Sequence, residues 1–355
     1  MTSTGGARRD DGTSMPSLML REACEAPAVV ARQIAANAEI CRNLVKRLKA
    51  APPRFAVTCA RGSSDSAAMF AKYLLEIRLG LVVASVGPSV GSIYGGKPQV
   101  EGALFLAISQ SGRSPDLIRL AEAARDGGAL TVALTNDPAS PLAERCEVVL
   151  PLHAGPEKSV AATKSYIASL AALLQLLAAW SGDAALARAV ERLPDDLADA
   201  LKRDWRPAVA TLADVQSLYV VGRGAGYAAA QEAALKLKET CGLHAEAVSA
   251  AEIMHGPWTL AGPDFPVIMF SQHDEALASL STLAANLTAR GVSLFAAGPV
   301  KADGAMRLPS ADGLHPFAQP IALVQSFYPL AEALARARRR DPDHPPHLMK
   351  ITETR

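Results

Sequence analysis

The sequence has almost no net charge and no long apolar run. Its 36 lysine and arginine residues are balanced by 35 aspartate and glutamate residues, for a formal net charge of +1. Such a chain has no long-range field to attract nucleic acid or a membrane surface. No stretch approaches the roughly 20 apolar residues of a membrane span, and the N-terminus lacks the apolar core of a signal peptide. We therefore expect a cytoplasmic protein that binds a small molecule.

Aromatic residues and paired cysteines are also scarce. Only 5% of the residues are aromatic although 50% are hydrophobic, so the core should consist mainly of Ala, Leu and Val. The five cysteines are odd in number and form no CxxC pair. This pattern favours a reducing compartment over a disulfide framework, and we interpret all five as small buried apolar residues.

Patterns typical of metal and dinucleotide sites are missing as well. His344 and His347 flank two prolines, but no Cys, His or carboxylate lies at ligand spacing from them, so no metal is expected. The Gly-Arg-Gly at 222–224 lacks the GxGxxG spacing of a nicotinamide site. No cofactor is predicted.

One segment occurs twice, 162 residues apart. Residues 54–77 read RFAVTCARGSSDSAAMFAKYLLEI, and residues 216–239 read QSLYVVGRGAGYAAAQEAALKLKE. The offset persists downstream, where ISQSGRS at 108–114 aligns with FSQHDEA at 270–276. A chain of 355 residues is long enough for two cores, and a duplication is the simplest interpretation.

The two copies differ in the residues that could bind an anion. The first copy places serines at two predicted strand-to-helix turns, where hydroxyls and free backbone N–H groups converge at helix N-termini. These serines are Ser63, Ser64, Ser109, Ser111 and Ser114. The second copy has Ala225 and Gly226 at one turn and Asp274 and Glu275 at the other, and carboxylates would repel a phosphate. The sequence predicts one phosphate pocket per chain, in the first copy.

Short apolar runs alternate with helical patterns through most of the chain. In the first copy we predict strands at 55–59, 81–86, 103–108, 130–134 and 147–150 and helices at 64–79, 114–127, 139–145 and 157–180. In the second copy we predict strands at 217–221, 266–270, 292–296 and 305–308 and helices at 226–241, 248–255, 275–290 and 317–339. This alternation predicts an α/β fold in which each copy is a doubly wound parallel sheet with helices on both faces.

Composition also suggests where the parts of the chain begin and end. Residues 1–16 are too polar to pack and are expected to be disordered. The first unit, with helices leading into it, spans 17–180, a helical connector spans 181–214, and the second unit spans 215–340. The proline-rich, charged residues 341–355 are typical of a frayed tail.

Three residues of the second copy could carry chemistry. Lys236 and Glu239 are spaced i,i+3 and share a helix face, at positions where the first copy has Leu74 and Ile77. The replacement of two apolar residues by a charged pair suggests a function that the first copy lacks. A solvated salt bridge with no such function is an equally good interpretation of the pair. His255 precedes Gly-Pro at a rigid corner, where imidazole could move protons near neutral pH, although most histidines are structural or solvated.

Four strings of the sequence resemble the sugar isomerase (SIS) superfamily. They are ISQSGRSPD at 108–116, AGPEKSVAATKS at 154–165, ALKLKETCGLHAEAVSAAEIMHGP at 234–257 and HLMKITE at 347–353. They look most like the isomerase half of glutamine-fructose-6-phosphate aminotransferase and the stand-alone glucosamine-6-phosphate deaminases. The resemblance implies a pair of flavodoxin-like SIS subdomains and a hexose or hexosamine 6-phosphate as ligand.

The resemblance also implies roles for individual residues. Substrate would be bound by Ser63, Ser64, Ser109, Gln110, Ser111, Ser114, Val160 and Ala162. Glu239, with Lys236 three residues before it, would move a proton between C1 and C2 of the sugar. His255 would assist ring opening and would reach into a partner subunit, which implies a homodimer. Lys350 would close over the open-chain sugar, so that the tail at 341–355 would act as a lid.

Three departures from the family pattern matter. Arg61-Gly62-Ser63-Ser64 stands where the aminotransferase has Cys-Gly-Thr-Ser, and Ala162 replaces a serine and removes a hydroxyl. The glutamine-hydrolysing domain is not expected, since only 16 polar residues precede the first predicted helix. The expected reaction is therefore that of glucosamine 6-phosphate with water to give fructose 6-phosphate and ammonia.

Several alternatives to this reaction stay open. Within enzymes they are galactosamine-6-phosphate deaminase, a deglycase of sugar-amine phosphates, and glucosamine-6-phosphate synthesis from free ammonia. Outside enzymes the alternative is a sugar-phosphate-sensing regulator. Such a regulator should carry an N-terminal helix-turn-helix domain, and it would not need Lys236, Glu239, His255 and Lys350 together.

Overall fold

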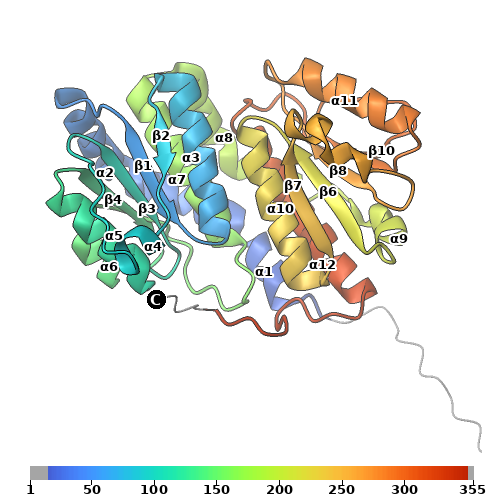
Figure 1. Cartoon of the computed structure of the whole chain (residues 1–355), viewed down its shortest axis with the longest axis horizontal. Coiled ribbons are helices and arrows are strands. Elements are labelled where there is room, and N and C mark those ends of the chain that lie inside the picture. Colours follow the sequence, from blue (N-terminus) through green and yellow to red (C-terminus); the bar gives the residue numbers. More distant parts are fainter. Residues whose placement is uncertain (1–14, 351–355) are drawn as a thin grey trace, which may run out of the picture.

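Two sheets lie side by side in the computed structural model, with helices between and around them (Figure 1). The structure describes residues 15–350, so the predicted disorder of residues 1–16 falls almost wholly outside the described residues. The described chain begins with α1 (Leu18–Cys24) and α2 (Ala26–Ala50). α2 packs mainly against the helix α7 (Lys164–Ser181) and the following helix α8 (Ala184–Ala200).

The first copy forms a parallel sheet of five strands in the order β2-β1-β3-β4-β5. Its strands are β1 (Ala56–Ala60), β2 (Val83–Ser85), β3 (Leu104–Ile108), β4 (Leu130–Thr135) and β5 (Val148–Pro151). Its further helices are α3 (Ser63–Leu79), α4 (Ser89–Ser92), α5 (Pro115–Asp126) and α6 (Pro141–Arg145). Successive strand residues point to opposite faces, so Phe105 packs with α5 and α6 while Leu106 packs in the larger core with α3 and α7.

The second copy repeats this topology, with five parallel strands in the order β7-β6-β8-β9-β10. Its strands are β6 (Ser217–Gly222), β7 (His244–Ser249), β8 (Val267–Phe270), β9 (Leu294–Ala297) and β10 (Met306–Leu308). Its helices are α10 (Ala225–Cys241), α11 (Leu277–Ala289) and α12 (Gln319–Ala337), and α9 (Val209–Leu212) precedes it. The predicted fold class, two doubly wound parallel sheets covered on both faces, is confirmed.

The helices α3 and α10 show the duplication in backbone conformation. Gly62 precedes α3 with φ 56° and ψ −133°, and Gly224 precedes α10 with φ 58° and ψ −135°. Both helices end at a left-handed glycine, Gly80 and Gly242, a conformation that side chains disfavour. The two helices contact each other, and the inner faces of both sheets share one core around them. The repeated turns are therefore brought close to the junction of the two copies.

Three sequence-based interpretations are corrected by the structure. The predicted helix over 248–255 is wrong, because residues 244–249 form the edge strand β7 and only a 3₁₀ turn follows at Glu252–His255. The helix predicted over 157–180 begins only at Lys164, since the Glu157 carboxylate accepts hydrogen bonds from the N–H groups of Thr163 and Ser165. Cys24 is exposed, whereas the other four cysteines are buried.

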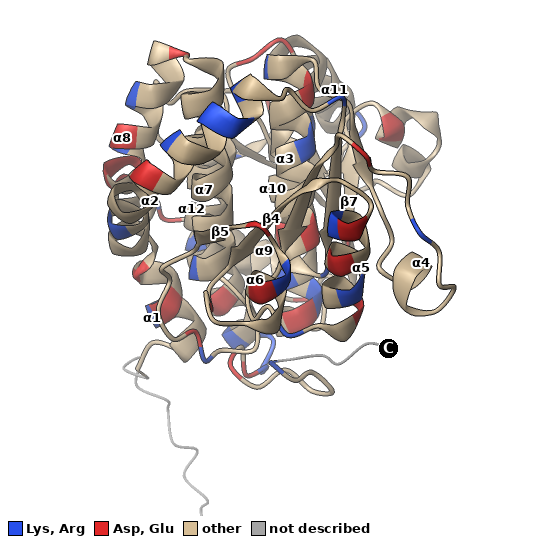
Figure 2. Cartoon of the chain, turned by 90° about the vertical axis from the view of Figure 1, so that its left-hand side faces the viewer, with Lys and Arg blue, Asp and Glu red and all other residues tan. Residues whose placement is uncertain are grey.

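The outer surface and the helices are consistent with the even charge balance. Lysine, arginine, aspartate and glutamate are interspersed on the ribbons seen in Figure 2.

The most apolar helix, α7, is buried from Lys164 to Ala178 because α2, α3 and α8 pack around it. Within residues 15–350, no helix is both long enough and apolar enough to cross a membrane.

The turn that begins α10 is filled by a side chain of the second copy itself. Gln272, the counterpart of Gln110, is fully buried and donates from Nε2 to the carbonyl of Arg223 at 2.8 Å and to Asp274 at 2.8 Å. A Cβ atom on Gly226, the counterpart of Ser64, would lie 2.4 Å from Gln272 Oε1. The second copy thus has glycine at this position because a larger residue would collide with Gln272.

This packing predicts a non-additive pair of substitutions. Gly226→Ser should destabilise the fold by about 1–3 kcal/mol, because Gln272 must move and lose its hydrogen bonds. The same substitution in a Gln272→Ala background should cost much less, so that the double-mutant cycle shows coupling of about 1 kcal/mol or more. Urea unfolding of the four proteins measures this, and additive free energies would mean that the two residues do not compete for space.

Candidate active site

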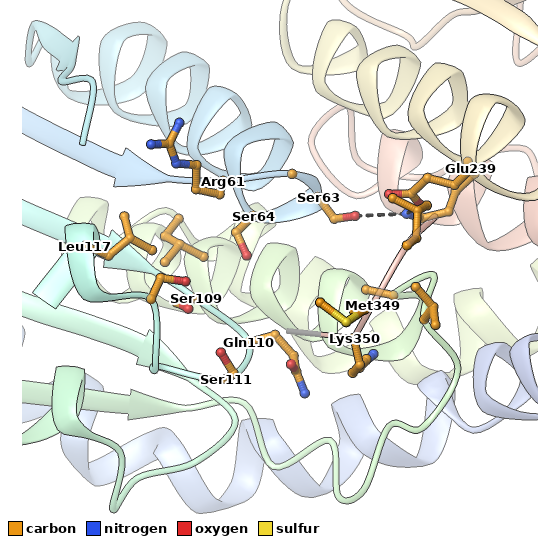
Figure 3. Close-up of a pocket in the computed structure, with 17 residues that line it drawn as sticks. Arg61, Ser63, Ser64, Ser109, Gln110, Ser111, Leu117, Glu239, Met349 and Lys350 are labelled. Atoms are coloured by element: carbon orange, nitrogen blue, oxygen red, sulfur yellow. Dashed lines mark hydrogen bonds and ion pairs between the residues drawn. The ribbon is translucent and has the colours of Figure 1, made fainter. Parts of the chain in front are cut away.

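A cavity of about 350 Å³ opens at the carboxyl ends of β1 and β3, next to α10 and the C-terminal segment (Figure 3). Its lining includes three of the four predicted catalytic residues, namely Lys236, Glu239 and Lys350. It also includes all eight predicted substrate-binding residues, namely Ser63, Ser64, Ser109, Gln110, Ser111, Ser114, Val160 and Ala162. Segments far apart in the sequence therefore converge on one cavity.

The serine turns form one end of this cavity. Ser63 is the first residue of the 17-residue helix α3, and Ser114 is the N-cap of the 12-residue helix α5, without a side-chain capping bond. Ser109 Oγ accepts a hydrogen bond from the Gly112 N–H at 3.1 Å, which fixes the turn between β3 and α5. Two helix N-termini and several hydroxyls thus face the same space, an arrangement suited to a phosphate group.

Arg61, one of the departures from the family pattern, lies at the edge of the same cavity. Its guanidinium donates two hydrogen bonds, of 2.7 and 3.2 Å, to Oδ2 of Asp116. The Asp116 side chain is buried, while that of Arg61 is about half exposed. The ion pair ties the turn after β1 to the start of α5.

Lys236 lies on the α10 side of the cavity, against Ser63 of the first serine turn. Its ammonium group is buried and lies 2.5 Å from Glu239 Oε2 and 3.5 Å from Glu232 Oε1, and it donates to Ser63 Oγ at 3.1 Å. Burial alone would lower the pKa of Lys236, but the two carboxylates outweigh it and raise the pKa above its usual value. Lys236 therefore stays charged and orients Glu239 at the cavity wall.

Glu232 is a member of this group that the sequence analysis missed. It is fully buried on α10, its Oε1 accepts from the Tyr328 hydroxyl at 3.2 Å, and its Oε2 has no hydrogen-bond partner among the described residues. Burial raises the pKa of Glu232 to about 7, although the Lys236 ammonium opposes the shift. The repeat contained the signal, because Glu232 replaces Phe70 just as Lys236 and Glu239 replace Leu74 and Ile77.

Lys350 reaches the cavity from the C-terminal segment. Its ammonium donates to the carbonyl of Ser159 at 2.7 Å and lies 3.3 Å from Glu157 Oε2. Burial alone would raise the pKa of Glu157, but Lys350 and the hydrogen bonds from Ser165 and Thr163 bring it below the usual value. Glu157 lies within the AGPEKS string, yet the sequence alone did not single it out.

His255 is the one predicted site residue that does not line the cavity. It is exposed, in the 3₁₀ turn Glu252–His255 that follows the edge strand β7. Gly256 after it has φ 145°, a conformation that few other residues adopt, so the corner is set by that glycine.

No group of three or more His, Cys, Asp or Glu residues suited to a metal ion occurs between residues 15 and 350.

The arrangement of groups suits a phosphorylated ligand with a reactive carbon chain. The serine turns would bind a dianionic phosphate, while Glu239, Lys236 and Lys350 supply a carboxylate and two ammonium groups from α10 and the C-terminal segment. A carboxylate fixed by a buried ammonium can exchange protons with carbon next to a carbonyl. The cavity therefore combines groups suited to a phosphorylated ligand with a carboxylate placed for proton transfer.

Comparison with known sequences finds relatives named as isomerising aminotransferases. A glutamine-fructose-6-phosphate aminotransferase (isomerizing) from Aeropyrum pernix is 33% identical over 356 residues, covering 94% of this chain and 57% of that protein. The enzyme of the same name from Thermococcus kodakarensis is 32% identical over 353 residues, covering 94% and 58%. The chain thus spans less than three fifths of the length of these curated relatives.

Solved structures extend the comparison to three dimensions. A candidate phosphosugar isomerase from Silicibacter pomeroyi has a TM-score of 0.87 and 43% identity, covering 92% of this chain and all of that one. The C-terminal domain of glucosamine-fructose-6-phosphate aminotransferase from Francisella tularensis has a TM-score of 0.82 and 26% identity, covering 95% and 100%.

A family model identifies the repeated unit itself. The model described as the SIS domain matches residues 53–179 and residues 211–296. The two matches contain α3 and α10 and the turns before them, and together they cover more than half of the chain. The chain therefore belongs to the SIS domain family.

Proposed function

We propose that this chain catalyses the isomerising deamination of an amino-sugar 6-phosphate, converting glucosamine 6-phosphate and water into fructose 6-phosphate and ammonia. The observation that supports it most is the Lys236–Glu239 pair, 2.5 Å apart, in the same cavity as the two serine turns. The serine turns suit a phosphate, and α10 supplies a carboxylate for proton transfer. The SIS family and its phosphosugar isomerase relatives agree with a sugar phosphate as ligand.

The mechanism assigns a separate task to each group. The serine turns bind the 6-phosphate, and the open-chain sugar extends toward Lys350. Glu239 takes the proton from C2 and returns it to C1, which converts the 2-amino aldose into a ketose imine. Water then adds to the imine carbon, and ammonia leaves. Lys236 keeps Glu239 oriented, and Lys350 engages the oxygen at C1.

Ring opening requires a further proton donor, which we assign to His255 of a second copy of the chain. His255 is exposed and lies away from the cavity of its own chain. Two exposed apolar residues, Met254 and Leu260, are its neighbours in the sequence. Apolar surface around an exposed polar group is typical of an interface between subunits. A homodimer would place this corner at the partner's cavity.

Mass action favours the deaminating direction when ammonia is not supplied at the site. The described residues that line the cavity include no cysteine. Water is present at far higher concentration than free ammonia, so hydrolysis of the imine is the favoured outcome. Synthesis of glucosamine 6-phosphate from fructose 6-phosphate is the second candidate, because the relatives reported above are named as aminotransferases of fructose 6-phosphate.

The proposed reaction is tested by incubating the purified chain with glucosamine 6-phosphate and with galactosamine 6-phosphate. Ammonia and ketose phosphate are measured separately, and the reverse reaction is run with fructose 6-phosphate and ammonium salt. Glu239→Gln should lower kcat by about 10²–10⁴, as expected for loss of a general base, with nearly unchanged sugar-phosphate binding. Normal turnover by this variant would reduce Glu239 to a salt-bridge partner, and no turnover by the wild type with either sugar would contradict the proposal.

Phosphate binding should depend on the first copy alone. The double substitution Ser109→Ala/Ser111→Ala should abolish most of the affinity for glucosamine 6-phosphate in calorimetric titration. Ser271→Ala is the matched control, since Ser271 is the counterpart of Ser109 in the second copy. Its hydroxyl donates to the Ala297 carbonyl at 2.8 Å and is buried, so this change should lower stability but leave affinity intact. Equal losses of affinity would show that both copies bind ligand.

The raised pKa of Glu232 predicts a pH-dependent stability. Between its ordinary value of 4.5 and about 7, Glu232 stays protonated in the folded chain and ionises in the unfolded chain. The contribution of Glu232 to the free energy of unfolding is therefore fully present below pH 4.5 and is lost as the pH rises through about 7. Relative to Glu232→Gln, the free energy of unfolding of the wild type should fall by roughly 1–3 kcal/mol over this interval. Urea unfolding at pH 5 and pH 8 checks this, and a relative gain with pH would mean that Lys236 stabilises Glu232 as a carboxylate.

A further inference from the structure

We infer that Asp343 and Glu22 are positioning residues for Lys350, and that they act through the short helix α1. The inference rests on the proposed function, in which Lys350 engages the sugar. We call residues 341–350 the C-terminal strap. Figure 1 shows this segment leaving α12, running beneath α10 and past α1, and continuing toward the first sheet.

The first attachment of the strap is at the N-terminus of α1. Both carboxylate oxygens of Asp343 accept backbone hydrogen bonds, Oδ2 from Leu18 at 2.7 Å and Oδ1 from Met19 at 2.7 Å. Residues more than 320 apart in the sequence are thereby joined. Two of the N–H groups that a helix leaves without partners in its first turn are satisfied by the strap.

The second link lies one helical turn further along α1. Glu22 is buried, and its two carboxylate oxygens accept from the backbone N–H groups of Lys158 at 2.5 Å and Ser159 at 3.1 Å. The carbonyl of the same Ser159 accepts the hydrogen bond from the Lys350 ammonium at 2.7 Å. Ser159 is thus fixed by Glu22 on its N–H side and binds Lys350 on its carbonyl side.

α1 itself is held in place by packing and can therefore fix the strap and the loop at 157–163 relative to each other. Met19 and Ala23 are fully buried, and the Ala23 carbonyl accepts a hydrogen bond from Gln325 Nε2 of α12 at 2.9 Å. The helix therefore joins three parts in one rigid unit: the start of the strap, the loop at 157–163 that lines the cavity, and α12. The positions of both ends of the strap therefore depend on the same seven-residue helix.

The last part of the strap has little packing of its own, since residues 346–349 are exposed, whereas Pro342 and Pro345 before them are buried. Leu348 lines the active-site cavity on one side and a second hollow of about 350 Å³ on the other, next to Lys238, Arg340 and Pro346. Met349 is 74% exposed. Packing around residues 346–349 does not fix the position of Lys350, so that position depends on its contacts with Glu157 and Ser159 and on the two attachments through α1.

The experiment compares Asp343→Ala with a cap of the same kind elsewhere. Asp183 caps α8 through hydrogen bonds from Ala185 N at 2.8 Å and Leu186 N at 3.1 Å, away from the residues that line the cavity. Its ion pair with the partly exposed Arg78 adds little to stability. Loss of either cap should destabilise the fold by a similar amount, about 1 kcal/mol. Only Asp343→Ala should lower kcat, by roughly tenfold to a hundredfold, with KM little changed because the serine turns still bind the phosphate.

Two conservative variants separate positioning from general stability. In Asp343→Asn and in Glu22→Gln, one side-chain oxygen remains as an acceptor and the other is replaced by an amide nitrogen that cannot accept. Each variant should therefore have a kcat between those of the wild type and the corresponding alanine variant. Loss of kcat that followed the melting temperature across all variants, Asp183→Ala included, would overturn the inference.

A readout independent of turnover tests the geometry directly. Brief acetylation of the folded chain with acetic anhydride, quantified by mass spectrometry, reports how accessible the Lys350 amine is. Asp343→Ala should increase labelling of Lys350 several-fold, and Asp183→Ala should not. Unchanged labelling would overturn the inference whatever happens to kcat. Increased labelling with unchanged kcat would support the link through α1 and would remove Lys350 from the proposed reaction.

Discussion

The buried ammonium group of Lys236 lies between two carboxylates where the two copies of the repeat meet. An unpaired charge at this depth would cost several kcal/mol, so Glu232, Glu239 and Ser63 must all be in place around it. Lys236 and both carboxylates come from α10, while Ser63 comes from α3 in the other copy. The site therefore exists only when the two helices pack together, and the core shared by the inner faces of both sheets holds them in contact.

The duplication supplied two equivalent turns, and the side chains at these turns differ between the two copies. In the first copy the turn keeps serines and opens into the cavity, with Gln110 at its wall. In the second copy the equivalent Gln272 is buried within the turn itself, and Gly226 leaves room for it. One copy then offers an anion site, while the other contributes charged residues from its helix. This division explains why a protein with two similar sheets has one site of this kind in its described part.

Polar segments complete the cavity from outside the sheets. The loop at 157–163 and the strap at 341–350 have too few apolar residues to order themselves by burial. Carboxylates that accept backbone hydrogen bonds replace that missing burial: Glu157 for the loop, Glu22 for its contact with α1, and Asp343 for the strap. Each bond is modest by itself, but together they bring Lys350 to the wall of the cavity.

The sequence by itself determined the repeat, the parallel α/β fold and most of the cavity lining. The spacing of apolar residues and the turn residues are local patterns, and the repeat is found by aligning the chain with itself. It missed the edge strand β7 and predicted a helix over 248–255, although the counterpart β2 marked the place of a strand in the first copy. Glu232 was visible as a replacement of Phe70, but its burial beside Lys236 could not be read from one helix. Contacts such as Asp343 with α1 join residues more than 320 positions apart, and no local pattern couples them. Tertiary structure alone decided these, because they depend on which surfaces the packed cores bring together.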